Sequence, residues 1–161
     1  MTDNHNNANV LLIPKIENGI VIDHIPSGYG VKILEIAHRH EELSTIIISL
    51  GMNYLSKRLG RKDLLKFQIK ELPPSFLQHL SLICPGVTIK RIENFAVEKK
   101  IVLDVPELVD KVLKCPNPSC ITNFEKSINT CFHLLEREPL TYGCNYCERH
   151  FSRAELEAAL P

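Results

Sequence analysis

Two cysteine turns in the last third of the chain leave little freedom in how that part can fold. Cys115 and Cys120 are separated by four residues, Cys144 and Cys147 are separated by two, and 23 residues lie between the two turns. Four thiolates supplied by two turns make a closed tetrahedral site, which suits Zn²⁺. Because sulfur would fill all four positions, no position is left for a catalytic water. The spacing therefore predicts one structural zinc ion.

A metal ion would also explain how so short a segment can fold. Residues 106–161 contain few large apolar side chains. A domain of about 55 residues seldom builds a sufficient core without a disulfide or a structural metal ion. The binding energy of the metal would then be largely folding energy for this part of the chain. We expect a small, β-rich four-cysteine zinc domain over 106–161, beginning with a helix over 106–113.

The other cysteines and the nearby histidines leave alternatives open. Cys131, His133 or His150 could replace one of the four ligands. A free cysteine is most often a small buried side chain, which is what we expect for Cys84 and Cys131. The second cysteine turn alone would suit a redox pair, but no thioredoxin-like βαβ pattern surrounds it.

The charge balance disfavours a nucleic-acid binder. The 161 residues carry 19 basic and 19 acidic side chains, so the formal net charge is zero, and 44% of the residues are hydrophobic. Proteins dedicated to nucleic acids usually carry a basic surplus, and disordered chains contain fewer apolar residues. Residues 107–161 hold six basic against eight acidic side chains. A zinc ribbon acting as a nucleic-acid adaptor is therefore the less favoured alternative to one that binds a protein.

Neither a membrane span nor a secretory signal is visible. No run reaches the roughly 18 apolar residues of a spanning helix. The first residues are polar and lack a basic region followed by an apolar one. We therefore expect a cytoplasmic protein, and in that reducing compartment cysteines more often hold metals than form disulfides. The Asn-rich beginning, 1–15, is expected to be a mobile arm.

Residues 16–105 read as alternating strands and helices. Strands are expected over 19–25, 45–50, 63–69 and 87–97, helices over 31–40 and 73–84, and a loop over 51–60. The continuous apolar run within the second strand indicates that both of its faces are covered. The order βαββαβ is that of a ferredoxin-like α+β domain, in which both helices cover one face of an antiparallel sheet. The other face is then solvated, or it meets a ligand or partner.

Basic side chains gather on one face of the third expected strand. Because side chains alternate along a strand, Lys62, Lys66 and Lys70 share one face, whereas Leu65 and Phe67 lie on the other. Such a face suits a polyphosphate, which lysine binds as a point charge. From the residues alone, a charged face that is simply solvated is the commoner case.

No enzyme motif accompanies this basic face. The chain lacks a Gly-rich phosphate loop, a His-Glu-x-x-His metal site and a Gly-x-Ser-x-Gly nucleophile turn. Asp23 and His24 could complete an anion site. As neighbours on a strand, however, they should point to opposite faces, so we do not expect them to form a catalytic pair. The sequence therefore predicts a binding protein and not an enzyme.

Five segments of the chain carry a family resemblance. They read VIDHIP at 21–26, GRKDL at 60–64, RIEN at 91–94, VLKCPN at 112–117 and CNYCE at 144–148. Together with the cysteine spacing they resemble, from about residue 16 to about residue 152, the regulatory chain of aspartate carbamoyltransferase. This resemblance favours a polyphosphate site over a merely solvated face on the basic strand.

The resemblance implies a non-catalytic chain with two functional domains. A domain over 16–105 would bind nucleotide effectors, and a zinc domain over 106–161 would contact the catalytic chain. Regulatory chains of this family form dimers through their N-terminal sheets. Three such dimers join two catalytic trimers, so that six regulatory and six catalytic chains form the enzyme, which acts in pyrimidine biosynthesis. In the family CTP inhibits, ATP activates and UTP can reinforce CTP.

The resemblance also implies which residues meet the nucleotide. They are Ile16, Val21, Asp23, His24, Lys62, Lys66, Lys90, Ile92, Phe95, Val97 and Lys100. Asp23 and Lys66 would hold the ribose, and His24, Lys62 and Lys100 would face the triphosphate. The backbone near the first residue of this set and around its phenylalanine would read the base, and the aliphatic members would line the pocket.

Two further residues are implied at the partner interface, and four positions depart from the family pattern. Asn117 and Glu148, beside the cysteine turns, would touch the catalytic chain. The departures are Pro14, Lys15, Lys90 in place of a frequent amide and Phe95 in place of a tyrosine. They leave open which nucleotide is preferred. They also leave open a rival function, a zinc-dependent assembly scaffold with a weakened nucleotide response.

Overall fold

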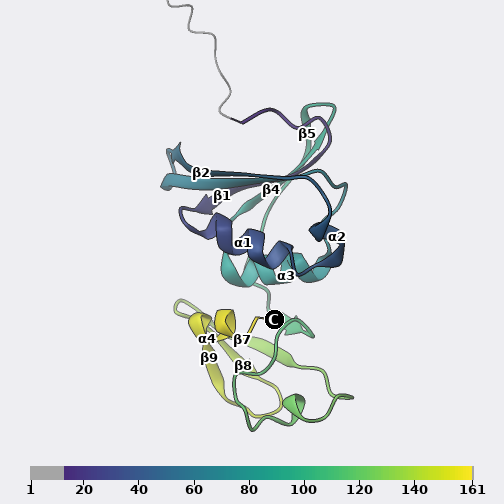
Figure 1. Cartoon of the computed structure of the whole chain (residues 1–161). Coiled ribbons are helices and arrows are strands. Elements are labelled where there is room, and N and C mark those ends of the chain that lie inside the picture. The colour runs from purple at the N-terminus through teal and green to yellow at the C-terminus, as the bar shows by residue number, and fades with distance from the viewer. Residues whose placement is uncertain (1–12, 161) are drawn as a thin grey trace, which may run out of the picture.

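Two antiparallel sheets organise the molecule. The structure is a computed structural model, and it describes residues 13–160. Most of the arm expected over 1–15 therefore lies outside the described residues. The five-stranded sheet forms with its helices an N-terminal domain, and the four-stranded sheet forms a smaller C-terminal domain below it (Figure 1). No helix of residues 13–160 is long and apolar enough to cross a membrane.

The N-terminal domain has the expected βαββαβ order with a short second helix after α1 and one additional edge strand. Its elements are β1 (Gly19–Pro26), α1 (Tyr29–Ala37), α2 (Glu41–Ser44), β2 (Ile48–Ser56), β3 (Gly60–Phe67), α3 (Pro74–Ile83), β4 (Thr88–Glu93) and β5 (Ala96–Val102). The strand order is β2-β3-β1-β4-β5, and every neighbouring pair is antiparallel. The predicted ferredoxin-like α+β class is confirmed, with β5 added beside β4.

The core of this domain lies between the sheet and the helices. On β1, Ile20, Ile22 and Ile25 are buried in one cluster with Leu65 and Phe67 of β3. Because side chains alternate along each strand, the intervening residues point to the opposite face. Helices α1 and α3 lie on the same side of the sheet (Figure 1), as predicted. The face of the sheet away from the helices is consequently the one that the core does not use.

Three features of this domain differ from the sequence prediction. The prediction of a loop over 51–60 is wrong. Strand β2 continues to Ser56, and it forms a hairpin with β3 that turns just before Gly60, whose φ is +70°. The single strand expected over 87–97 is two strands, since Asn94 and Phe95 have φ of 49° and 63° and form a tight turn. The prediction that both faces of the second strand are covered is also wrong, because Ile47 is 63% exposed.

The C-terminal domain is a small sheet with one terminal helix. Its elements are β6 (Leu108–Asp110), the 3₁₀ turn η1 (Ile121–Asn123), β7 (Cys131–Arg137), β8 (Leu140–Cys144), β9 (His150–Ser152) and α4 (Arg153–Ala158). The helix expected over 106–113 is wrong. Val109 and the later apolar residues suggested helical spacing, but the segment pairs with β7 and ends at Lys111, whose φ is 61°. A tertiary partner therefore overrides the local pattern.

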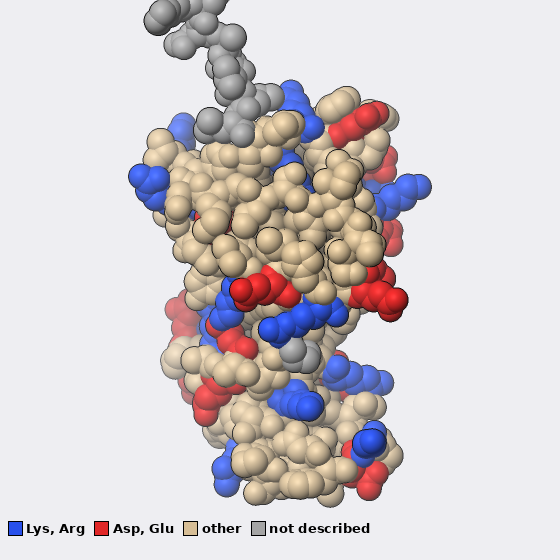
Figure 2. Space-filling view, viewed as in Figure 1, with Lys and Arg blue, Asp and Glu red and all other residues tan. Residues whose placement is uncertain are grey.

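The two domains contact each other through α1, α3 and α4. Leu82 of α3 is buried in the core cluster of the C-terminal domain. Arg153 of α4 donates a hydrogen bond to the carbonyl of Ile83, and Lys32 of α1 forms an ion pair with Glu157. Acidic and basic side chains are gathered around this seam (Figure 2). The seam is therefore apolar inside and charged at its rim.

Candidate functional site

The four cysteines of the two turns form one compact cluster. The Sγ atoms of Cys115, Cys120, Cys144 and Cys147 all lie within 4.8 Å of one another. Two of the pairs are separated by 3.7 Å and 3.9 Å, from Cys115 to Cys147 and from Cys120 to Cys144. Segments far apart in the sequence thus bring four sulfur donors to one point. This donor set suits a tetrahedral metal ion of the zinc type.

Hydrogen bonds to backbone carbonyls give the first cysteine turn its shape. The N–H of Cys120 donates to the carbonyl of Asn117 at 3.0 Å. The side-chain amide of Asn123 donates to the carbonyls of Asn117 at 2.8 Å and of Cys115 at 3.0 Å. The asparagines hold the turn from inside. Asn117, expected at the partner interface, is itself buried.

The second turn is closed in a similar way. The N–H of Glu148 donates to the carbonyl of Cys144 at 3.0 Å, and Glu148 has a φ of 56°. Its side chain is exposed next to the metal cluster. Glu148 is thus free to meet a partner surface, whereas the side chain of Asn117 is occupied within its own turn, where it accepts from the N–H of Ser119 at 3.1 Å.

The surroundings of the sulfur atoms differ. Burial raises the pKa of Cys115 and that of Cys144. Burial also acts to raise the pKa of Cys147, but hydrogen bonds from the Asn117 side chain and the Arg149 backbone outweigh it and lower the pKa to about 7. A metal ion bound at this cluster would stabilise the thiolate form of the buried cysteines, which is the form that coordinates metals.

The remaining cysteines and histidines lie outside this cluster. Cys84 is buried among apolar side chains, as predicted, and burial raises its pKa to about 12. Cys131 is only half-buried, so the prediction of a buried thiol is wrong for this residue. It lies at the start of β7 and accepts a hydrogen bond from Nδ2 of Asn145 at 3.0 Å. The Nδ1 atom of His133 lies 2.5 Å from Oδ1 of the same asparagine.

The second candidate site is the sheet face away from the helices. The strand register places Lys66 opposite Val21, Val21 opposite Lys90, and Lys90 opposite Lys100. Residues directly opposite each other across a ladder point to the same face. Three lysines from β3, β4 and β5 therefore stand in one row across the sheet. Such a row attracts a polyanion.

A buried carboxylate stands beside this row. Asp23 is 6% exposed, and its two carboxylate oxygens accept from Nζ of Lys62 at 2.6 Å and Nζ of Lys90 at 2.7 Å. Burial acts to raise its pKa, but the hydrogen bonds from the two lysines and from the N–H of His24 outweigh it. They hold the pKa of Asp23 well below its usual range. Asp23 is thus ionised and orients two lysines from neighbouring strands.

A β-bulge brings His24 to the same carboxylate. The register of β1 shifts between Ile22 and Ile25, and His24 has a φ of 60°. As a result Nδ1 of His24 lies 3.6 Å from Oδ2 of Asp23. The expectation that the two side chains point to opposite faces is therefore wrong, because the bulge interrupts the alternation. Burial lowers the pKa of His24; the Asp23 carboxylate opposes this effect, and the nearby lysines add to it.

The aliphatic and aromatic residues of the predicted set lie at the other end of the face. Ile92 pairs with Val97 across the β4–β5 hairpin. The backbone N–H of Phe95 donates to the carbonyl of Glu17 at 2.9 Å, and the phenyl ring is 58% exposed. The segment before β1 therefore meets the β4–β5 turn. Ile16 belongs to that segment. On this sheet face, the predicted nucleotide-binding residues therefore form a polar end around Asp23 and an apolar end around the β4–β5 turn.

Sequence reasoning treated residues 14 and 15 only as departures from a pattern, but both line a cavity next to the lysine row. Lys66 donates a hydrogen bond to the carbonyl of Pro14, and burial lowers the pKa of this lysine. The cavity has a volume of about 200 Å³ and is lined by Pro14, Lys15, Ile16, Ser49, Lys66 and Gln68. No signal in the sequence could have placed these residues together, because their neighbours come from β2 and β3.

Fold and sites together define a class of protein. It is a two-domain binding protein, in which a ferredoxin-like domain with a cationic sheet face is joined to a metal-binding module. Comparison with known proteins identifies the class more closely. Residues 11–104 match the family model of the aspartate carbamoyltransferase regulatory chain, allosteric domain, and residues 107–157 match that of its metal binding domain.

Curated relatives agree over nearly the whole chain. Aspartate carbamoyltransferase regulatory chains from Pyrococcus horikoshii and Clostridium tetani are 39% and 41% identical to it over 150 and 147 residues. These alignments cover 93% and 91% of this chain and 98% and 99% of the relatives. The chain belongs to the family of aspartate carbamoyltransferase regulatory chains. The predicted resemblance is confirmed, and the chain is a non-catalytic subunit with an allosteric and a metal-binding domain.

Proposed function

We propose that this chain binds the nucleotides CTP, ATP and UTP on the cationic sheet face and transmits their effect to the catalytic chains. The observation that carries the proposal is the row of Lys66, Lys90 and Lys100 beside the Asp23–Lys62 ion pair. This arrangement combines several cations with an ionised hydrogen-bond acceptor. A nucleoside triphosphate offers the matching groups, namely a polyanionic tail and ribose hydroxyls.

Individual roles follow from the two ends of the face. Asp23 and Lys66 hold the ribose, since an ionised carboxylate accepts hydrogen bonds from hydroxyl groups. His24, Lys62 and Lys100 face the triphosphate. Lys62 already points toward this end, because its Nζ lies 2.6 Å from Asp23.

The base is placed at the apolar end. The backbones near Ile16 and Phe95 read its polar edge, and Val21, Ile92 and Val97 line the pocket around it. The hydrogen bond between Phe95 and the carbonyl of Glu17 supports this placement, because it brings the two base-reading segments together.

Lys90 gives this site a feature of its own. Its ammonium group bonds Asp23 from β4, opposite the bond from Lys62 on β3. Lys90 therefore adds positive charge at the centre of the site. In our proposal it contacts the nucleotide, and it competes with the ribose hydroxyls for the carboxylate.

The metal domain serves assembly. We infer that Cys115, Cys120, Cys144 and Cys147 hold one structural Zn²⁺. When bound, the ion crosslinks the two turns and stabilises this domain. Beside the turns, Ile121, Phe124 and Tyr146 are 49%, 71% and 46% exposed.

Exposed apolar side chains of this kind are typical of a protein–protein contact. They support docking on the catalytic chain through a surface that includes the exposed Glu148 and the first cysteine turn, whose shape the buried Asn117 maintains. Dimers of this chain then bridge two catalytic trimers, giving six catalytic and six regulatory chains in a cytoplasmic enzyme of pyrimidine biosynthesis.

Calorimetric titration of the zinc-loaded chain tests nucleotide binding. CTP and ATP should each bind in a saturable way and should compete with each other. Lys66→Ala should weaken both by about ten-fold, because it removes a charge-assisted contact. Lys126→Ala, an exposed lysine of the metal domain, is the matched control and should leave both affinities unchanged.

The alternatives give other results in the same system. If neither nucleotide binds, while chelation of the metal abolishes assembly with the catalytic trimer, the chain is an assembly scaffold. If RNA or DNA binds with a steep salt dependence and nucleotides do not, it is a nucleic-acid adaptor. Either result would overturn the effector proposal.

A further inference from the structure

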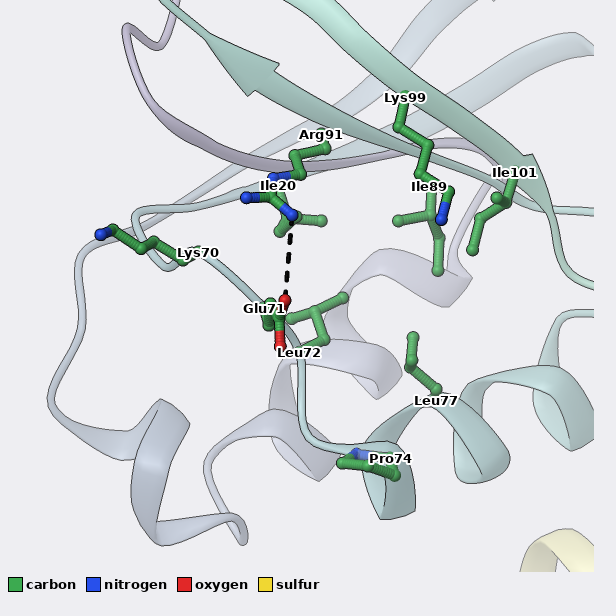
Figure 3. Close-up of a pocket in the computed structure, with 10 residues that line it drawn as sticks. All are labelled: Ile20, Lys70, Glu71, Leu72, Pro74, Leu77, Ile89, Arg91, Lys99 and Ile101. Atoms are coloured by element: carbon green, nitrogen blue, oxygen red, sulfur yellow. Dashed lines mark ion pairs between the residues drawn. The ribbon is translucent and has the colours of Figure 1, made fainter.

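A separate cavity lies on the helix side of the same sheet. It has a volume of about 340 Å³, within the range of about 300–1,000 Å³ that is common for small-ligand sites. The sheet forms one wall, α3 forms the opposite wall, and the segment after β3 closes one side (Figure 3). Its lining residues are Ile20, Lys70, Glu71, Leu72, Pro74, Leu77, Ile89, Arg91, Lys99 and Ile101.

The strand register divides this cavity into two ends. Ile89 of β4 lies opposite Ile101 of β5, and one step further along the same face Arg91 lies opposite Lys99. Leu77 of α3 faces the aliphatic pair (Figure 3). An apolar end is therefore followed by a cationic end, in the direction of the β4–β5 turn.

The cations at that end differ in how well they are neutralised. Arg91 pairs with Glu93 and Glu98 at 3.0 Å each, and more loosely with Glu71 at 3.8 Å. Lys70 and Lys99 have no carboxylate within 4.0 Å among residues 13–160. Glu71 is the one acidic residue that lines the cavity, and its side chain is 82% exposed. Arg91 is thus neutralised by neighbouring carboxylates and the Lys70 ammonium points away from the cavity (Figure 3), which leaves Lys99 as the unpaired cation of the lining.

We propose that this cavity binds a small amphiphilic carboxylate, with an aliphatic tail among Leu77, Ile89 and Ile101. The carboxylate group lies between Lys99 and Arg91. It takes the position of Glu71, which moves out into solvent. The ligand class follows from the cavity itself: the aliphatic end disfavours a fully polar anion, and the unpaired Lys99 ammonium repels an amine.

This site is distinct from the nucleotide face. Ile89 and Arg91 alternate along β4 with Lys90 and Ile92, which point to the opposite side of the sheet. A ligand in the cavity therefore contacts the other face of the same strand that carries nucleotide-binding residues. The two ligands share β4 without sharing a contact surface.

Calorimetric titration of the full, zinc-loaded chain with sodium octanoate, kept below its micellar concentration, tests this proposal. Octanoate should bind in a saturable way, whereas octylammonium, which has the same tail and the opposite charge, should not. Lys99→Gln should weaken octanoate binding by about two- to five-fold, as expected for one partly exposed ion pair. Glu71→Gln should strengthen it, because the competing carboxylate is gone.

Variants in the apolar end and on the other face complete the test. Leu77→Trp should abolish binding by filling the cavity, and Ile101→Trp on the edge strand replaces it if the first variant does not fold. Lys126→Gln in the metal domain and Lys66→Ala on the nucleotide face should leave octanoate affinity unchanged. Equal binding of octylammonium, or a Lys99→Gln variant that behaves like Lys126→Gln, would overturn the proposal. Neither result would bear on nucleotide binding.

Discussion

Two buried aspartates show how differently one residue type is used in this chain. Asp23 bonds two lysines on the sheet face, whereas Asp63 faces the helices and is fully buried. The carboxylate of Asp63 accepts backbone N–H groups of Gly28, Gly30 and Asn53 at 2.9, 3.0 and 2.9 Å. It therefore ties the turn before α1 to the irregular part of β2.

Removing the Asp63 carboxylate should destabilise the N-terminal domain. Asp63→Ala leaves three N–H groups without their acceptor, and the buried one, at Gly30, costs about 1–3 kcal/mol when it is left unpaired. We expect a loss of about 1–3 kcal/mol in the free energy of unfolding, measured by urea denaturation. Asp63→Asn should lose less, and Asp110→Ala, at an exposed aspartate, should change little. A loss for Asp63→Ala no larger than for Asp110→Ala would show that these bonds are not structural.

At the scale of elements, helix α3 connects the two domains through a buried histidine. Nε2 of His79 lies 2.8 Å from the carbonyl oxygen of Val112 in the C-terminal domain. Its Nδ1 lies 3.3 Å from Nε2 of His40, and Nδ1 of His40 lies 3.4 Å from the hydroxyl oxygen of Ser75. Burial lowers the pKa of His79. The Val112 hydrogen bond acts in the opposite direction, and the charge of Arg39 adds to the lowering.

This histidine should make the stability of the zinc-loaded chain depend on pH. Its pKa is lower in the folded chain than the 6.5 of the unfolded one, so the unfolded state binds more protons below about pH 6.5. The free energy of unfolding should therefore fall with decreasing pH, by at most about 1.4 kcal/mol per pH unit for one proton.

His79→Gln should show a shallower decrease between pH 7 and pH 5 than the unchanged chain, in urea titrations with the metal bound. His150→Gln, at an exposed histidine, is the matched control. His40 contributes in the same direction, because burial and the neighbouring His79 lower its pKa, although Glu42 opposes this. Equal pH slopes for His79→Gln and the unchanged chain would contradict the prediction.

At the scale of the whole molecule, the composition of the two cores predicts that the C-terminal domain depends on a bound metal and the N-terminal domain does not. The N-terminal domain has a continuous core of aliphatic and aromatic side chains between its sheet and helices. The core cluster of the C-terminal domain is smaller and includes Cys115, Cys120 and Cys144 themselves. Without an ion, these thiols provide little cohesion.

Removal of the metal should therefore unfold one domain and leave the other folded. A chelator should abolish the β6–β9 sheet while the β1–β5 sheet persists, as amide hydrogen exchange would report. The loss should be on the order of 10 kcal/mol of metal-linked folding energy. Cys144→Ser should mimic the chelator, whereas Cys131→Ser should not, since Cys131 lies outside the cluster. A chelated chain that keeps protection in β7 and β8 would contradict this dependence.

Much of the architecture could be predicted from local patterns. Alternation over 63–69 indicated one buried and one charged face of β3, and Pro and Gly residues marked both ends of α3. The spacing of the four cysteines indicated a metal site because each turn is short and its geometry is encoded within six residues. The βαββαβ order followed from the succession of such segments, and the family followed from five short motifs.

Features that depend on distant partners could not be predicted in this way. Segment 106–113 has apolar spacing compatible with a helix, but pairing with β7 makes part of it a strand. The bulge at His24, the lysine row across β3, β4 and β5 and the three bonds to Asp63 all depend on register between strands that are far apart in sequence. Local periodicity and turn chemistry act over a few residues and are therefore present in the chain itself. Register, bulges and shared cavities arise only when separate segments compete for the same hydrogen bonds and the same buried space.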